Sequence, residues 1–196
     1  MPMISALKAA DTQFSPIDIQ NRPLGAKIVA VAVGCALLAL SSYIEVPMVP
    51  VPITMQTLAV GLVGALYGWR LGTLTIITWL VQGAVGIPVL AGGAAGAHHF
   101  IGPTAGYLFA FPIAGAAMGW LAEHGWNGKR PLLAFAGMLI SNGLCLALGA
   151  LWLATLVGLS EAVAVGVAPF LIGAFLKAAL GAAVLRIIRI QPGRSH

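Results

Sequence analysis

Apolar residues fill this chain in long stretches that contain no Asp, Glu, Lys or Arg. A helix that crosses a lipid bilayer needs roughly 20 consecutive apolar residues, so such stretches predict membrane-spanning helices. One chain therefore holds several spans and leaves no room for a separate soluble domain. The uncharged stretches are residues 28–44, 46–69, 71–122, 131–160 and 162–176.

Charged residues, glycines and prolines divide these stretches into six predicted helices. The second and third are short, and the glycine-rich connection 87–103 is expected to be a structured loop. The predicted fold class is an all-α integral membrane protein, a compact bundle of six transmembrane helices over residues 26–190. A cytosolic arm is expected at 1–25 and a cytosolic tail at 191–196. The predicted helices are residues 26–44, 54–68, 71–86, 104–123, 132–159 and 165–188.

Composition agrees with this membrane class: 60% of the residues are hydrophobic and 8% are charged, whereas soluble domains carry about 25% charged residues. The 25 glycines indicate close helix packing, because small residues let membrane helices approach one another. Cys35 and Cys145 lie inside apolar runs and are expected to be small core residues. The basic residues are scattered, so no nucleic-acid partner is expected.

The distribution of Lys and Arg predicts the orientation of the chain, because these residues concentrate in short cytosolic loops. With six spans, every Lys and Arg outside the spans falls on one side. We therefore expect a bacterial cytoplasmic membrane protein with both termini cytosolic and with outer loops at 45–53, 87–103 and 160–164. The basic residues on the inner side are Lys8, Arg22, Lys27, Arg70, Lys129, Arg130, Arg186, Arg189 and Arg194.

Lys177 is the one formally charged residue that is well inside a predicted span. An ionisable group within the membrane is costly and is a functional candidate by default. No Asp or Glu lies in the interior of any predicted span, since Glu123 is the last residue of its helix, so the ligand itself could supply the anion that pairs with the ammonium. The alternative is a lysine that snorkels to the interface or is neutral.

Polar and aromatic residues on other helices are expected at a similar depth to Lys177. Asn142, Cys145, Gly149 and Trp152 recur at three- and four-residue spacing on the fifth predicted helix, which makes a stripe with an aromatic end. An aromatic wall beside a cation suits a ligand with an apolar body and a charged end. The other candidates in the outer half are Gln56, Thr57, Gln82 and Tyr107.

Catalytic and metal sites are not predicted. His98 and His99 are adjacent on an irregular loop, and no nearby Cys, Asp or Glu completes a metal site. No Walker loop, HExxH or GxSxG pattern is present. We therefore expect neither an enzyme nor a bound cofactor.

Small residues form a ridge on one face of the first predicted helix, at Ala26, Ala30 and Gly34. Such ridges favour close helix contact. The ridge serves either packing within the bundle or docking on a second membrane protein, and the sequence pattern leaves both open.

Four segments together resemble the BioY family of biotin-binding S components of energy-coupling factor transporters. The segments are VPMVPVPITMQTLAVGLVGALYGWRLG, GAVGIPVLAGGAAG, GPTAGYLFAFP and PFLIGAFLKAALGAAVLR, in that order. The resemblance covers most of residues 24–190. It implies a six-helix protein that binds biotin in its outer half and works with a transmembrane scaffold (T) subunit and cytosolic ATPases.

The resemblance also implies roles for particular residues. Gly92, Gly93, Tyr107, Trp152 and Lys177 would hold the ligand, and the ridge at Ala26, Ala30 and Gly34 would dock on the scaffold subunit.

The sequence departs from the family pattern at Ala174, where many relatives have an aspartate. An asparagine that is common in relatives near the GxPVF segment is also replaced, by Gly92 or its neighbours. Gln56, Gln82, Asn142 or the His98–His99 pair could contact the ureido ring instead.

Two other classes of function compete with ligand capture for a transporter. A self-contained secondary carrier for a small carboxylate-bearing vitamin would need a group for ion or proton coupling, and no carboxylate lies in the interior of a predicted span. A membrane enzyme or a structural scaffold is the remaining class, and the scaffold alternative leaves Lys177 without a ligand.

Overall fold

The computed structural model describes residue 19 and residues 22–190, with side chains described up to residue 188. Five helices in this part of the chain are long and apolar enough to cross a membrane. Most of the predicted arm 1–25 and the predicted tail 191–196 lie outside the described residues. Arg22 to Gly25 are described, and α2 begins at Leu24 rather than at residue 26.

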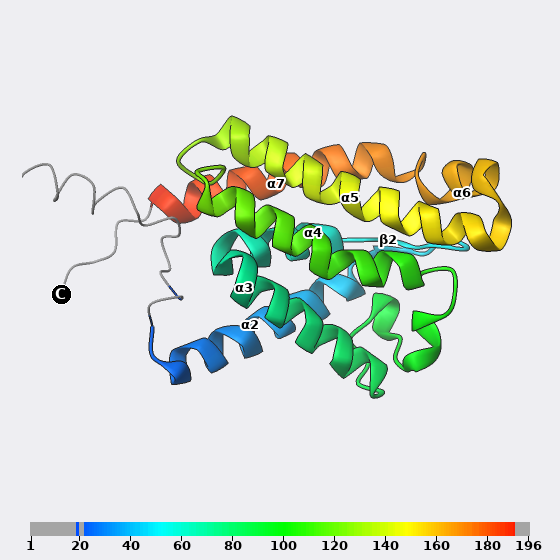
Figure 1. The fold of residues 1–196 in the computed structure, drawn as a ribbon, viewed down its shortest axis with the longest axis horizontal. Helices are drawn as coiled ribbons and strands as arrows, with labels where there is room; N and C mark the ends of the chain where they lie inside the picture. The colour runs from blue at the N-terminus through cyan, green and yellow to red at the C-terminus, as the bar shows by residue number, and fades with distance from the viewer. Residues whose placement is uncertain (1–18, 20–21, 191–196) are drawn as a thin grey trace, which may run out of the picture.

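The longest helix, α3 (Gln56–Ala84), is two helical arms joined at a sharp break. Gly68 has φ 78° and ψ 171°, a backbone conformation that favours glycine. A Cβ on Gly72 would lie 3.0 Å from the Cα of Gly64, whereas eight residues of continuous helix span roughly 12 Å. The two arms therefore fold back on each other, and Figure 1 shows the reversal. They correspond to the predicted second and third helices.

Counting the two arms of α3, six helical segments cross the bundle, so the predicted fold class is confirmed. The other four are α2 (Leu24–Tyr43), α4 (Ala105–Glu123), α5 (Pro131–Val157) and α7 (Phe170–Ile190). At the break in α3, the backbone N–H of Trp69 donates to Oε1 of Glu123 at 3.2 Å. This carboxylate accepts from an N–H at the start of the second arm, where a negative charge is stabilising.

Glycines bring α3 and α4 close together. A Cβ on Gly64 would overlap the carbonyl of Gly115, and a Cβ on Gly119 would lie 2.5 Å from the backbone nitrogen of Trp69. Close backbone approach at small residues is the usual way in which membrane helices pack. The predicted role of glycine in a tight bundle is therefore confirmed at these positions.

The predicted outer loops contain regular structure that the sequence pattern did not predict. A short antiparallel hairpin pairs β1 (Glu45–Val46) with β2 (Ile53–Thr54). The connection between α3 and α4 contains two single-turn helices, η2 (Ala91–Gly93) and η3 (Ala97–Phe100). Expecting an ordered loop at 87–103 was therefore correct.

The predicted boundary between the last two helices was wrong. Gly158, with φ 86°, ends α5, and a short helix α6 (Leu159–Gly166) follows it directly. The final helix then begins at Phe170, after Pro169, rather than at residue 165. The apolar run continues through this region with only Glu161 to interrupt it, so hydropathy could not locate the turn.

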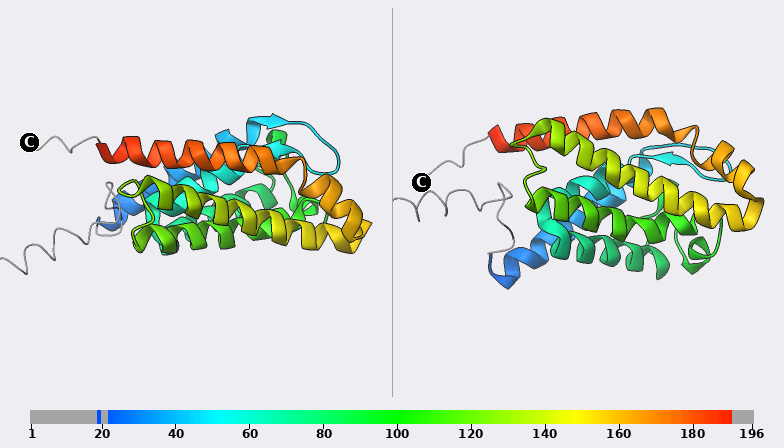
Figure 2. Two further views of the ribbon diagram at one scale, coloured as in Figure 1. Left: turned by 90° about the horizontal axis from the view of Figure 1, so that it is seen from above. Right: turned by 45° about the horizontal axis from the view of Figure 1, so that its top comes forward.

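The elements divide into two ends, which the two further views also show (Figure 2). One end, here called the loop end, contains the β1–β2 hairpin, η2, η3 and α6. The opposite end, here called the terminal end, contains the start of α2, the break in α3, the α4–α5 connection and the end of α7. Lys27, Arg70, Lys129, Arg130 and Arg186 belong to segments at the terminal end.

Candidate substrate-binding site

A cavity of about 370 Å³ lies towards the loop end of the bundle. This volume is within the range of roughly 300–1,000 Å³ that is usual for small-molecule pockets. It is surrounded by residues from the β1–β2 hairpin, the 87–103 loop, α3, α4, α5 and α7. The lining residues used below are Pro50, Thr54, Gln56, Thr57, Leu90, Ala91, Ala94, His98, His99, Gly102, Tyr107, Leu108, Phe111, Cys145, Leu146, Phe170 and Lys177.

Lys177 of α7 lines this cavity and is 9% exposed. Its Nζ donates to the backbone carbonyl of Thr54 at 2.6 Å and to Oγ1 of Thr57 at 3.3 Å. Both partners are neutral, and no Asp or Glu is among the described residues that line the cavity. The lysine is therefore held in place without any charge to pair with, and an ammonium has three protons to donate.

Gln56 hydrogen-bonds to Thr54, as Lys177 does, and contains an unpaired donor. The side chain is 4% exposed, and its Oε1 accepts a hydrogen bond from Oγ1 of Thr54 at 2.9 Å. Its Nε2 is the one buried side-chain nitrogen or oxygen without a partner among the described residues. A buried unsatisfied donor costs free energy in the empty protein, about 1–3 kcal/mol, and it calls for an explanation. An acceptor on a bound molecule would satisfy it.

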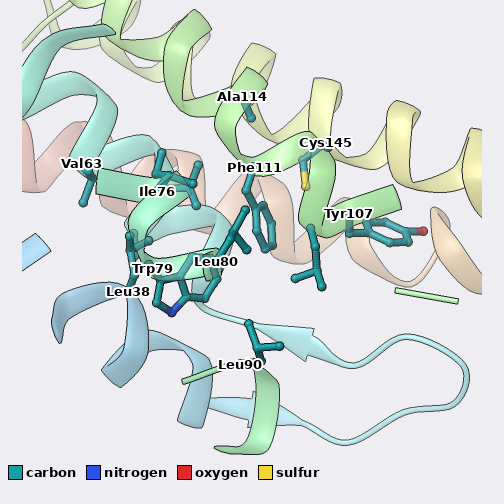
Figure 3. Packing of buried hydrophobic residues seen from close by; sticks show 14 of the residues in the cluster. Leu38, Val63, Ile76, Trp79, Leu80, Leu90, Tyr107, Phe111, Ala114 and Cys145 are labelled. Atoms are coloured by element: carbon teal, nitrogen blue, oxygen red, sulfur yellow. The ribbon is translucent and has the colours of Figure 1, made fainter. Parts of the chain in front are cut away.

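Apolar side chains form most of the remaining wall. Figure 3 shows Phe111 of α4 and Cys145 of α5 directed towards the same space, with Leu90 of the loop on the opposite side. Phe170, at the start of α7, stacks on Tyr107 with ring centroids 6.4 Å apart. The cavity thus combines an apolar body with a polar corner formed by Lys177, Thr54, Thr57 and Gln56, while His98 and His99 line it at the roof.

Tyr107 contributes its ring rather than its hydroxyl group. The hydroxyl donates to the carbonyl of Gly166 at 2.8 Å, which ties α4 to the end of α6. The ring lies against Gly149, where a Cβ would overlap it. Tyr107 is therefore positioned as a fixed aromatic wall, and the glycine in the predicted stripe of α5 makes room for it.

Trp152 does not line the cavity, although it lies on the predicted stripe. Its Nε1 donates to the carbonyl of Gly102 at 3.0 Å. Gly102 does line the cavity, so Trp152 acts on the site by holding the end of the loop in place.

Three hydrogen bonds attach the start of the 87–103 loop to the bundle. Oγ of Ser42 and Nε1 of Trp79 both donate to the carbonyl of Val89, at 2.7 and 2.9 Å. The hydroxyl of Tyr43 donates to the carbonyl of Pro88 at 2.6 Å. The loop is thereby fixed as a roof over the cavity.

Gly92 and Gly93 lie in this roof but do not line the cavity. Their φ values are 63° and 80°, in a backbone region that residues with a side chain rarely adopt. A Cβ on Gly92 would lie 2.6 Å from Oε1 of Glu45, and one on Gly93 would lie 2.9 Å from Tyr43. These glycines therefore let the loop turn against α2 and β1, while Ala91 and Ala94 beside them line the cavity.

Gln82 and Asn142 are not among the residues that line the cavity. Gln82 is half-buried near the end of α3. Asn142 is buried in α5, where its Nδ2 donates to the carbonyl of Met138, one turn earlier. Asn142 lies on a helix that borders the cavity but on another face of it, whereas Gln82 is on the second arm of α3, which contributes no described lining residue.

His98 and His99 both line the cavity at η3, with ring centroids 4.1 Å apart. Burial and the neighbouring His98 lower the pKa of His99 below its ordinary value. A neutral imidazole can donate through one ring nitrogen and accept through the other. Within the described residues, no group of three or more His, Cys, Asp or Glu side chains comes together in a way that could hold a metal ion.

The sequence analysis did not single out several residues that line the cavity. Phe111, Leu108 and Leu146 are apolar residues on helices that are apolar all round, so nothing in the pattern separates the cavity face from the lipid face. The spacing of four residues between Tyr107 and Phe111 was the one available signal, because it places both on one helix face.

A bundle of membrane helices that surrounds a cavity, with a buried ammonium whose hydrogen-bond acceptors are neutral, defines a membrane protein that binds a small anion-bearing molecule. The chain belongs to the BioY family, whose family model matches residues 11–193.

Similar proteins agree with this family assignment. The chain is 39% identical to the probable biotin transporter BioY of Pyrococcus horikoshii, over 82% of this chain and 93% of that protein. It is 32% identical to the biotin transporter BioY of Thermotoga maritima, over 86% and 99% of the two chains. The crystal structure of the S component for biotin from an ECF-type ABC transporter superposes with a TM-score of 0.72, 25% identity, and coverage of 85% and 92%.

Proposed function

We propose that this chain captures biotin as the substrate-binding S component of an ECF-type transporter and passes it across the cytoplasmic membrane. The observation that carries this proposal is the polar corner of an otherwise apolar cavity. The ammonium of Lys177 has only neutral partners, and the Nε2 of Gln56 has none. A carboxylate on a compact apolar molecule supplies what both groups lack.

The proposed orientation places the carboxylate of biotin against Lys177 and Gln56 and its rings along Tyr107 and Phe170. This orientation leaves the ureido group near the roof, where the imidazole rings of His98 and His99 line the cavity. The family aspartate that is replaced by Ala174 is then not required for the carboxylate. Its absence fits a different set of contacts at the ureido end.

The proposed partners are a transmembrane scaffold subunit and cytosolic ATPases, and the proposed topology has both termini in the cytosol. Among the three ridge residues, Gly34 is buried, and a Cβ there would lie 2.6 Å from a methyl group of Thr75. Ala26 is exposed and Ala30 is half-buried. Docking would therefore use the first part of α2, while Gly34 packs against α3.

We further propose that the chain is not an enzyme and transports no coupling ion. The described residues that line the cavity include no carboxylate that could act as a general acid or carry a proton. A secondary carrier would need such a group, so the proposed role as the S component of an ECF-type transporter is favoured.

Uptake of labelled biotin distinguishes these two classes. Cells that express the chain with its scaffold and ATPase subunits should accumulate biotin. Substituting the lysine that binds nucleotide in the ATPases should reduce this uptake by at least tenfold. A protonophore that leaves cellular ATP unchanged should have little effect. Uptake that survives the ATPase substitution but collapses with the protonophore would support the secondary carrier instead.

A further inference from the structure

A second hollow lies at the terminal end of the molecule, far from the cavity under the loops. It has a volume of about 310 Å³, and the described residues that line it are Lys27, Arg70, Leu71 and Leu74. Lys27 is in the first turn of α2, and the other three are at the start of the second arm of α3. The hollow therefore combines two cations from different helices with an apolar side.

Neither cation forms an ion pair within the described part of the chain. Glu45 and Glu161 are at the loop end, and the carboxylate of Glu123 accepts from the backbone of Trp69. The guanidinium carbon of Arg70 lies 5.1 Å from the centroid of the Trp69 ring, which holds the charge over an aromatic face. Within the described residues, therefore, no carboxylate pairs with either charge.

On the proposed topology, with the terminal end at the cytosolic face, the apolar side of the hollow is deeper in the membrane than the cations. Arg70 and Leu74 are four residues apart, so they share a helix face with Leu74 about 6 Å further along the axis. Leu74 is 54% exposed and Trp69 is 41% exposed. Tryptophan concentrates at the level of lipid headgroups, so Trp69 and Arg70 are at that level and the leucines are at the level of the acyl chains.

We propose that this hollow binds one anionic phospholipid, with its phosphate between Lys27 and Arg70 and an acyl chain along Leu71 and Leu74. Basic pockets between membrane helices at the cytosolic face are suited to anionic headgroups. An acidic side chain of a partner protein would satisfy the two cations but would not cover the exposed side chain of Leu74. A phospholipid contacts both parts of the hollow.

Thermal unfolding of the purified chain in a neutral detergent, titrated with phosphatidylglycerol or with phosphatidylcholine of the same acyl chains, tests this proposal. We expect phosphatidylglycerol to reach half-maximal stabilisation at a concentration roughly 30-fold lower than phosphatidylcholine. Each of the two basic residues adds about 1 kcal/mol of attraction to the anionic headgroup. The double variant Lys27→Gln/Arg70→Gln should lose this preference to within about threefold. Soluble glycerol phosphate should not replace the lipid, because it has no acyl chain.

The matched control is Arg130→Gln/Arg186→Gln, which removes two exposed charges from the same end but outside the hollow. It should keep the preference for the anionic lipid. An equal loss in both double variants would show general surface attraction and overturn the site. The proposal would also be overturned if wild type shows no preference, if glycerol phosphate stabilises as well as the lipid, or if Lys27→Gln/Arg70→Gln keeps the preference and loses only assembly with partner subunits.

Discussion

Replacing Lys177 with methionine is expected to weaken the binding of biotin roughly 30-fold or more. Methionine keeps much of the side-chain volume but removes the charge. Truncating one partner of a buried charge pair typically costs about 2–5 kcal/mol, because the other charge is left unpaired, and about 1.4 kcal/mol is tenfold in affinity. Equilibrium binding of labelled biotin to the purified wild-type and variant proteins measures the effect.

The control for this prediction is a neutral amide analogue of biotin. Lys177 also holds the carbonyl of Thr54 and the hydroxyl of Thr57, so the variant could disturb the hairpin as well as the charge. A disturbed hairpin would weaken acid and amide alike, whereas loss of the charge weakens the acid selectively. Equal losses for both ligands, or unchanged binding of the acid, would show that Lys177 is not the carboxylate anchor.

Replacing Gln56 with methionine is expected to weaken biotin binding by about tenfold or more. Its Nε2 is buried and has no hydrogen-bond partner among the described residues, so we expect an acceptor on the ligand to take that donor. Hydrogen bonds to charged groups are worth about 1.5–3 kcal/mol. The same equilibrium binding measurement applies, and the amide analogue should again lose less than the acid.

Gln82→Met is the matched control, because it makes the same chemical change on the other arm of α3, beyond the break at Gly68. Gln82 is half-buried and does not line the cavity, so its replacement should change affinity by less than about twofold. If the two variants weaken binding equally, the effect comes from altered packing of α3 and the donor of Gln56 plays no part in recognition.

The sequence predicted the helical architecture well because lipid imposes simple requirements on a spanning segment. Every backbone N–H and C=O in the hydrocarbon must be paired, so a long uncharged run must form a helix. The break at Gly68 was also predictable, because glycine is followed closely by Arg70, a charge that belongs at the interface. The end of α5 was predicted within two residues, but the short helix α6 and the start of α7 at Phe170 were not, because the residues of α6 are apolar except for Ser160 and Glu161.

The candidate site was predictable only where burial of a polar group is costly. Lys177 and Gln56 stand out from an apolar sequence, and both line the cavity. Asn142 stands out equally, yet its amide bonds to its own helix, an option that the sequence cannot reveal. The partner of Lys177 is a backbone carbonyl of the hairpin, and backbone groups have no signature in the side-chain pattern.

The remaining predictions were limited because the sequence does not show which face of an apolar helix points towards the cavity. Trp152 has the predicted depth but lies one step outside the cavity, where it supports the loop through Gly102. On helices that are apolar all round, periodicity does not separate a face towards a ligand from a face towards lipid or another helix. Gly34 illustrates the same limit, since the ridge pattern predicted close contact but not that the contact would be with α3.

Binding of biotin to the purified chain, without scaffold or ATPase subunits, is the measurement that tests the central claim most directly. Titration with labelled biotin should show saturable binding of one molecule per chain. Unlabelled biotin should displace the label, and the amide analogue should do so at concentrations at least about 30-fold higher, as expected for an anchored carboxylate. Absence of saturable binding by the folded chain, or equal displacement by biotin and its amide, would contradict the account.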